Sequence, residues 1–128
     1  MLWPMAEPLA LVVYERVLPG TQLVNRLEDL GYRVHTFHDP AALVGHAERE
    51  KPMLALVDLG RKVAENCAAI TQLRQNQATA HLPVIALVPP ADAQAQEAAR
   101  AAGATLVVHD STILAHLDQF LAQALELD

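Results

Sequence analysis

Residues 52–60 constrain the fold more than any other stretch, because five apolar residues lead directly into a carboxylate and a glycine. The run 53–57 shows no alternation of apolar and polar positions. A strand of this kind is covered on both faces, as in a parallel sheet flanked by helices. In such sheets, ligands gather outside the carboxyl ends of the strands. We therefore expect the surface around Asp58 to be the functional one.

Four more apolar segments alternate with helical patterns. The expected strands are 9–13, 32–37, 82–88 and 105–108, besides the one ending at Asp58. Five helices are expected. Two begin with the N-caps Thr21 and Asp39, a third runs from Val63, and a fourth covers 91–102. The last helix follows Asp110 or Ser111 as its N-cap. Such alternation predicts βαβ units. The strand that alternates best, 32–37, belongs at an edge. The fold class is therefore α/β, a flavodoxin-like (βα)5 three-layer sandwich with a parallel five-stranded sheet of order 2-1-3-4-5.

Length and composition fit one domain. With 128 residues and 52% hydrophobic content, the chain can bury a core, and we divide it into an irregular lead-in, 1–8, and a domain, 9–128. Trp3 is interpreted as part of a loosely docked tail. A net charge of −6 argues against nucleic-acid and anionic-membrane partners. No signal peptide or span of ~20 apolar residues is visible, so a cytoplasmic protein is expected.

The cysteine and histidine content limits the chemistry. A single cysteine, Cys67, excludes an internal disulfide and a multi-cysteine zinc site, and its spacing places it in the core face of a helix. His109 follows a strand and is expected to be solvated. The other histidines show no ligand spacing: His35, His38, His46, His81 and His116.

From about Pro8 to Glu126, the sequence resembles the receiver domain of bacterial two-component response regulators. Residues 52–58 are similar to the family's proline, apolar run and phosphoacceptor aspartate, which would make Asp58 the phosphoacceptor position. Residues 83–87 resemble its fourth strand, and 102–104 resemble the glycine-alanine corner before its fifth. The resemblance implies a signalling module of the two-component or phosphorelay type.

The other functional positions of the family match poorly. Two adjacent acids are usual after the first strand, where this chain has Tyr14 and Glu15. Val88 replaces a hydroxyl residue, Asp110 replaces a lysine, and Val107 replaces an aromatic switch residue. The resemblance therefore implies a degenerate pseudo-receiver, with only the phosphoacceptor position kept and Glu15 as a longer substitute.

These exchanges have physical consequences for phosphorylation. Magnesium requires several oxygen ligands in near-octahedral geometry, so Glu15 and Asp58 are expected to hold it weakly or not at all, and no cofactor is required. Asp110 places a negative charge where the family has a lysine, so it would repel the phosphoryl group that the lysine attracts. Unit charges ~4 Å apart interact by about 4 kcal/mol at an effective dielectric of 20. Val88 cannot donate the hydrogen bond that reports phosphorylation.

Simpler roles remain open for the same residues. Asp58 could pair locally with Arg61 or Lys62, and Asp110 could be an ordinary N-cap. A cation site built from Glu15, Asp58 and Asp110 is the sharper alternative. If these three acids converge, a cation, a basic neighbour or a shared proton should accompany them. The Tyr14 ring is expected to cover the former pocket.

Three functional hypotheses follow. The first is a stand-alone, non-enzymatic receiver-like module that acts by phosphorylation-independent contact with a histidine kinase or other signalling protein. The resemblance implies partner or homodimer contacts through the fourth helix, fifth strand and fifth helix, over 91–102 and 112–128. The alternative is a divergent receiver phosphorylated on Asp58 by a histidine kinase. The third is an enzyme or small-molecule binder using the strand-end cleft, although no nucleophile and base pair supports it.

Overall fold

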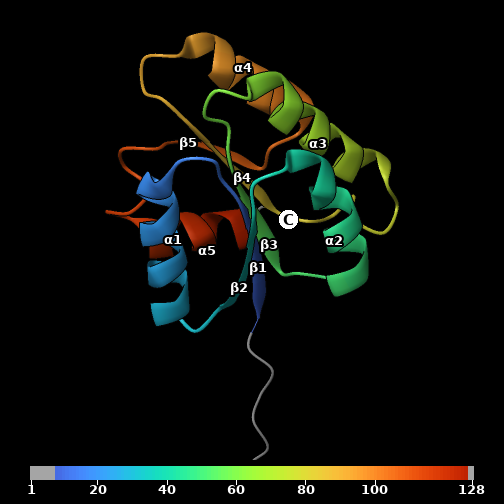
Figure 1. The fold of residues 1–128 in the computed structure, drawn as a ribbon, viewed down its shortest axis with the longest axis horizontal. Helices are drawn as coiled ribbons and strands as arrows, with labels where there is room; N and C mark the ends of the chain where they lie inside the picture. Colours follow the sequence, from blue (N-terminus) through green and yellow to red (C-terminus); the bar gives the residue numbers. More distant parts are fainter. Residues whose placement is uncertain (1–7, 127–128) are drawn as a thin grey trace, which may run out of the picture.

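The computed structural model describes residues 8–126, and within them five parallel strands form one sheet of order 2-1-3-4-5 (Figure 1). This confirms the predicted fold class. The strands are β1 (Leu9–Val13), β2 (Arg33–Phe37), β3 (Leu54–Asp58), β4 (Val84–Val88) and β5 (Leu106–His109). The helices are α1 (Val17–Asp29), α2 (Leu43–Glu50), α3 (Val63–Gln75), α4 (Ala93–Ala102) and α5 (Leu117–Glu126), with a 3-10 turn (Pro40–Ala42) before α2. Most of the expected lead-in, including Trp3, lies outside the described residues.

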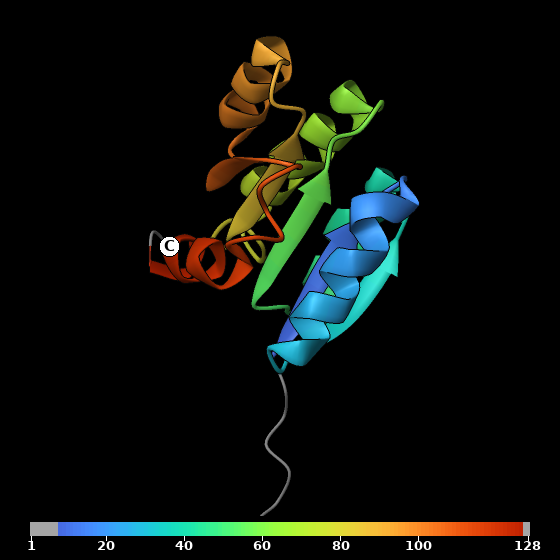
Figure 2. The same ribbon diagram turned by 90° about the vertical axis from the view of Figure 1, so that its left-hand side faces the viewer.

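Helices cover both faces of the sheet (Figures 1 and 2). One face packs against α1 and α5, and the other against α2, α3 and α4. Strands β1, β3 and β4 are buried along their whole length, which explains why their sequences do not alternate. The edge strand β2 is mostly exposed, as its alternation predicted.

Helix α1 begins five residues earlier than expected from an N-cap at Thr21. Its N-cap is Arg16, and the helix runs through Pro19 and Gly20. Proline is tolerated there because the N–H groups of the first turn have no partner within the helix. Gly20 lies where the ring of Tyr14 passes, so no side chain could be accommodated without movement. The Pro-Gly pair, which usually ends a helix, stands inside its first turn.

The other helix boundaries follow their capping residues more closely. The Asp39 carboxylate accepts a hydrogen bond from the Ala41 N–H at 3.0 Å, which caps the turn before α2. Asp92, expected inside a helix, is the N-cap of α4 and accepts from the Ala95 N–H at 3.0 Å. Gly103 ends α4 in the left-handed conformation with φ of 109°.

Helix α5 begins at Leu117, so the expected N-cap at Asp110 or Ser111 is wrong. Residues 110–116 form turns instead. Ile113 in these turns and Leu117 are buried against the sheet, and they anchor the segment. The turns free the Asp110 side chain for another partner. Over residues 8–126, no helix is long and apolar enough to cross a membrane.

Candidate functional site

The acids predicted from sequence meet at the carboxyl edge of the sheet. Asp58 is the last residue of β3, Glu15 follows β1, and Asp110 follows β5. Because all strands are parallel, their carboxyl ends share one edge. The Asp110 N–H bonds the Val88 carbonyl at 2.9 Å, which fixes the backbone beside β4.

A single guanidinium group joins two of these acids. Arg16 Nε donates to Asp58 Oδ2 at 3.2 Å and Arg16 Nη2 donates to Asp58 Oδ1 at 2.7 Å, which is a bidentate contact. Arg16 Nη2 also donates to Asp110 Oδ2 at 3.1 Å. The Asp58 side chain is 1% exposed, that of Asp110 is 15% exposed and that of Arg16 is 38% exposed. Arg16 therefore covers Asp58 from the solvent side.

Arg16, Asp58 and Asp110 form what we call the clamp, and its electrostatics favour the charged form of Arg16. The hydrogen bond to Asp58 raises the pKa of Arg16 above its ordinary value. This effect is larger than the lowering by burial, and the hydrogen bond to Asp110 raises the pKa further. A planar guanidinium suits a carboxylate in the bidentate geometry, and charge-assisted bonds of this kind are about twice as strong as neutral ones. Arg16 thus provides the basic neighbour that converging carboxylates require.

Glu15 does not join the clamp. Its carboxylate lies 3.7 Å from Lys62 Nζ, and both side chains are more than one-third exposed. Among residues 8–126, no group of three His, Cys, Asp or Glu side chains is arranged to hold a metal ion. The predicted cation site of Glu15, Asp58 and Asp110 is therefore not assembled. The residues present do not fit magnesium, because Arg16 binds both Asp58 oxygens.

Tyr14 lies beside the clamp and packs away from it. A Cβ atom added at Gly20 would come within 2.1 Å of the Tyr14 ring, so the ring lies directly against α1. The ring also meets the imidazole of His38 edge-on, with centroids 5.1 Å apart. His38 Nδ1 lies 2.6 Å from the Tyr14 carbonyl oxygen. The ring thus packs against α1 and His38, and the side chain that contacts the Asp58 oxygens is Arg16, not the expected Tyr14.

The remaining family-matched positions, Val88 and Val107, carry apolar side chains. Val88 is fully buried in the core, and Val107 is half-buried against the same cluster. His109, expected to be solvated, is half-buried, and its Nε2 lies 3.3 Å from Gln96 Nε2. None of these side chains places a hydroxyl or ammonium group at Asp58.

Hydrogen bonds from the side chain of Asn66 stabilise the loop after Asp58. Asn66 in the first turn of α3 donates to the carbonyls of Leu59 at 3.2 Å and Lys62 at 2.9 Å. Cys67, the next residue, is half-buried against the core, as predicted, and burial raises the pKa of its thiol.

The partner of Asp58 was predicted incorrectly. Arg61 and Lys62, the expected partners, are close in sequence, but the bond comes from Arg16, 42 positions away. Its only sequence signal was a basic residue directly after Glu15, at the end of the first strand.

Several solved structures with the same fold are receiver domains or response regulators. The receiver domain of a sensor histidine kinase from Pseudomonas aeruginosa, with a magnesium ion in its active-site cleft, has a TM-score of 0.84 at 26% identity, over 94% of this chain and 99% of that one. The signal receiver domain of a histidine kinase from Syntrophus aciditrophicus gives 0.81 at 18%, over 93% and 90%. A response regulator from Thermotoga maritima gives 0.78 at 21%, over 94% and 99%. No family model and no curated protein sequence matches the chain.

Proposed function

We propose that this protein is a receiver-like signalling module of the two-component type that acts by binding other proteins, without phosphorylation of Asp58 and without catalytic turnover. The receiver fold of its structural neighbours supports the class. The observation that carries the proposal is the clamp, in which Arg16 binds both oxygens of the buried Asp58 carboxylate.

The clamp opposes phosphoryl transfer in two ways. A carboxylate oxygen that attacks phosphorus must be accessible, and here the Asp58 side chain is 1% exposed and both of its oxygens accept hydrogen bonds from Arg16. The transferred group also carries negative charge that a metal normally neutralises. The Asp110 carboxylate on the same guanidinium would repel it.

The signal would then depend on a surface. We place it over α4, β5 and α5. Leu106 and Val107 on the edge strand β5 are half-buried, and α4 exposes the small side chains of Ala93 and Ala101. Small exposed side chains allow another chain to approach closely. We propose a histidine kinase or other signalling protein as partner, and a homodimer through the same face as a second use.

Intact mass after incubation with magnesium and acetyl phosphate tests the proposal. We expect no added phosphoryl mass on the wild-type protein, and the same result for Asp58→Asn. The competing function is a divergent phosphoacceptor, in which Arg16 swings into solvent and a histidine kinase phosphorylates Asp58. A phosphoryl adduct on the wild-type chain that Asp58→Asn abolishes would establish that function instead.

A further inference from the structure

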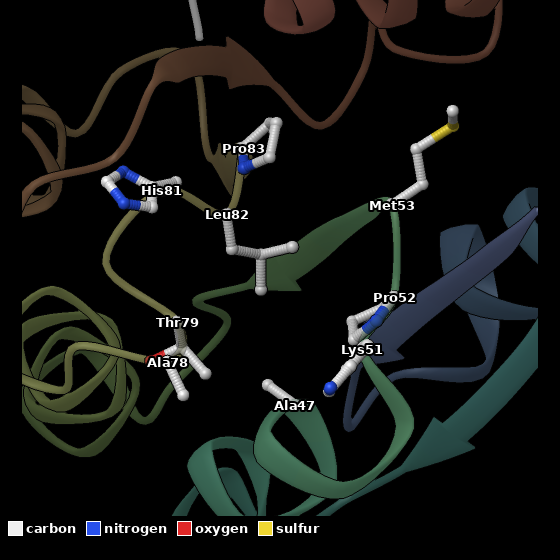
Figure 3. A pocket seen from close by; sticks show the side chains of 9 residues that line it. All are labelled: Ala47, Lys51, Pro52, Met53, Ala78, Thr79, His81, Leu82 and Pro83. Carbon is white, nitrogen blue, oxygen red and sulfur yellow. The ribbon is translucent and has the colours of Figure 1, made fainter.

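An apolar groove lies at the amino edge of the sheet, opposite to Asp58. It has a volume of about 320 Å³ and is formed by the end of α2, the start of β3 and the connection between α3 and β4 (Figure 3). Its lining residues are Ala47, Lys51, Pro52, Met53, Ala78, Thr79, His81, Leu82 and Pro83. Figure 3 shows Leu82 between His81 and Thr79 on one side and Pro52 and Lys51 on the other.

The floor of this groove is formed by apolar residues, and a large hydrophobic residue at its rim is exposed to solvent. Ala47, Leu82 and Pro83 are buried beneath it. Met53 is 46% exposed, and it is one of two large hydrophobic side chains that the described part of the chain exposes. Methionine is common at surfaces that bind other proteins, because its side chain is flexible and polarisable.

The groove wall is held in place by internal hydrogen bonds. Arg74 of α3 donates to the carbonyl oxygens of Ala80 at 3.0 Å and Leu82 at 2.6 Å. The Thr79 hydroxyl donates to the Leu73 carbonyl at 2.7 Å. The connection between α3 and β4 is therefore fixed, and binding would require little ordering of this wall.

Two ionisable side chains line the groove, and each is a base. They are Lys51 and His81, in a protein whose net charge is −6. Lys51 caps α2 in the left-handed conformation, with φ of 49°, which non-glycine residues adopt uncommonly. Glu48 on the same helix is engaged by Asn76 Nδ2 at 2.7 Å. Lys51 thus places a positive charge beside an apolar floor.

We infer that this groove is a docking site for a peptide segment of a protein partner, in which apolar side chains alternate with carboxylates. An apolar side chain would lie on Leu82 and Met53, and an adjacent carboxylate would pair with Lys51. The volume is at the lower end of the ~300–1,000 Å³ typical of ligand pockets, and suits one or two side chains. The groove lies at the other end of the strands from the clamp, so its use is independent of the state of Asp58.

The test uses the full chain with its methionine methyl groups labelled with carbon-13, and Met53→Ala assigns the Met53 resonance. The probe is an N-acetylated, C-amidated peptide of alternating aspartate and leucine. We expect it to shift the Met53 methyl resonance at saturable concentration. The same peptide with lysine for aspartate, or serine for leucine, should leave that resonance unmoved.

Matched variants separate the groove from general charge and from the clamp. Lys51→Glu should weaken binding about fivefold or more, which corresponds to about 1 kcal/mol. Arg49→Glu, an exposed charge reversal on the same helix outside the groove lining, should change it little. Met53→Ala should weaken binding measured by titration calorimetry, and Leu30→Ala, at the other exposed hydrophobic side chain, should not. Lys62→Gln, an exposed position beside the clamp at the opposite end of the strands, should bind as the wild type does.

Three results would overturn the inference. The first is no Met53 shift with the acidic peptide, or an equal shift with the lysine peptide. The second is self-association in sedimentation that Lys51→Glu abolishes, which would make a second copy the occupant. The third is a Met53 shift caused by Trp3→Ala without peptide, which would make the chain itself the occupant.

Discussion

The two ends of the parallel sheet use charge in opposite ways. At the carboxyl end, Arg16 binds two acids and leaves Asp58 almost without solvent contact. At the amino end, Lys51 stands on the rim of an apolar groove with no carboxylate in the lining. At the end where parallel sheets usually hold their ligands, the acids therefore bind Arg16 of the same chain, whereas the opposite end exposes an apolar surface and the charge of Lys51.

Arg16→Ala should have the largest effect of the changes considered, because it leaves the buried Asp58 carboxylate without its cation. We expect the free energy of unfolding to fall by about 3 kcal/mol, at the lower end for a broken buried ion pair since Arg16 is partly in water. Urea unfolding measures it.

Two further variants make that result specific. Arg61→Ala removes an exposed arginine from the loop after Asp58 and should change stability by no more than about 0.5 kcal/mol. Adding Asp58→Asn to Arg16→Ala should recover part of the loss, because the stranded charge is gone. Equal losses for Arg16→Ala and Arg61→Ala would show that the clamp contributes nothing to folding.

Gly20→Ala tests the packing of Tyr14 beside the clamp. The new Cβ would lie 2.1 Å from the ring, so the ring must move, and we expect a loss of about 2 kcal/mol. In a Tyr14→Ala background the sign should reverse, because alanine stabilises a helix by roughly 0.5–1 kcal/mol relative to glycine. Thermal unfolding of the four proteins gives the comparison. A loss of the same size in both backgrounds would contradict the ring contact.

A substitution of Glu50 on α2 tests the contribution of a charged group near the end of the sheet that carries the groove. His46 Nδ1 lies 2.8 Å from Glu50 Oε2, and His35 bonds the other carboxylate oxygen. The hydrogen bond from His46, followed by that from His35, lowers the pKa of Glu50 below its ordinary value of 4.5. Because the folded pKa is the lower one, Glu50 stabilises the fold above about pH 4.5, and this contribution is lost as the pH falls through the lowered value.

Urea unfolding between pH 3 and pH 7 should show this difference. Glu50→Gln is expected to lose stability at pH 6, by less than about 1 kcal/mol for so accessible a pair, and to converge with the wild type at pH 3. Glu28→Gln, at an exposed position on α1, should follow the wild-type curve. A constant gap between Glu50→Gln and the wild type at every pH would remove the electrostatic explanation.

Lys62→Gln should have the smallest effect, although it lies at the carboxyl end beside the clamp. Its Nζ is 3.7 Å from the Glu15 carboxylate and both groups are well exposed, so we expect a change within about 0.5 kcal/mol. Thermal unfolding at low and high salt checks it. A loss as large as that of Arg16→Ala would mean that Glu15 belongs to the clamp after all.

The sequence predicted the sheet better than the helix starts. Unbroken apolar runs gave β1 with its observed bounds and placed Asp58 at the end of β3, because full burial on both faces leaves a clear signature. The start of α1 was missed because Pro19 and Gly20 usually break a helix, and their tolerance depends on the first turn and on the Tyr14 ring. The turns before α5 were missed because Ile113 continues the helical apolar pattern without being helical.

The sequence predicted the acidic residues of the site but not the arginine that binds them. Strand ends identify Asp58 and Asp110 because parallel topology brings them to one edge. Arg16 follows the first strand, yet nothing in its neighbourhood tells which side chain it will bind across the sheet. Local spacing favoured Arg61 and Lys62 for Asp58, and only the three-dimensional arrangement selects Arg16.

A magnesium titration followed by proton-nitrogen NMR tests the clamp most directly. The signals to follow are the Asp58 amide and the Arg16 Nε–H, with Asp58→Asn as the control. If Arg16 occupies the Asp58 oxygens, millimolar magnesium should leave both wild-type signals in place and the Arg16 Nε–H should remain protected from exchange. A saturable shift of the Asp58 amide, together with loss of that protection, would show that a metal displaces Arg16 and would contradict the account.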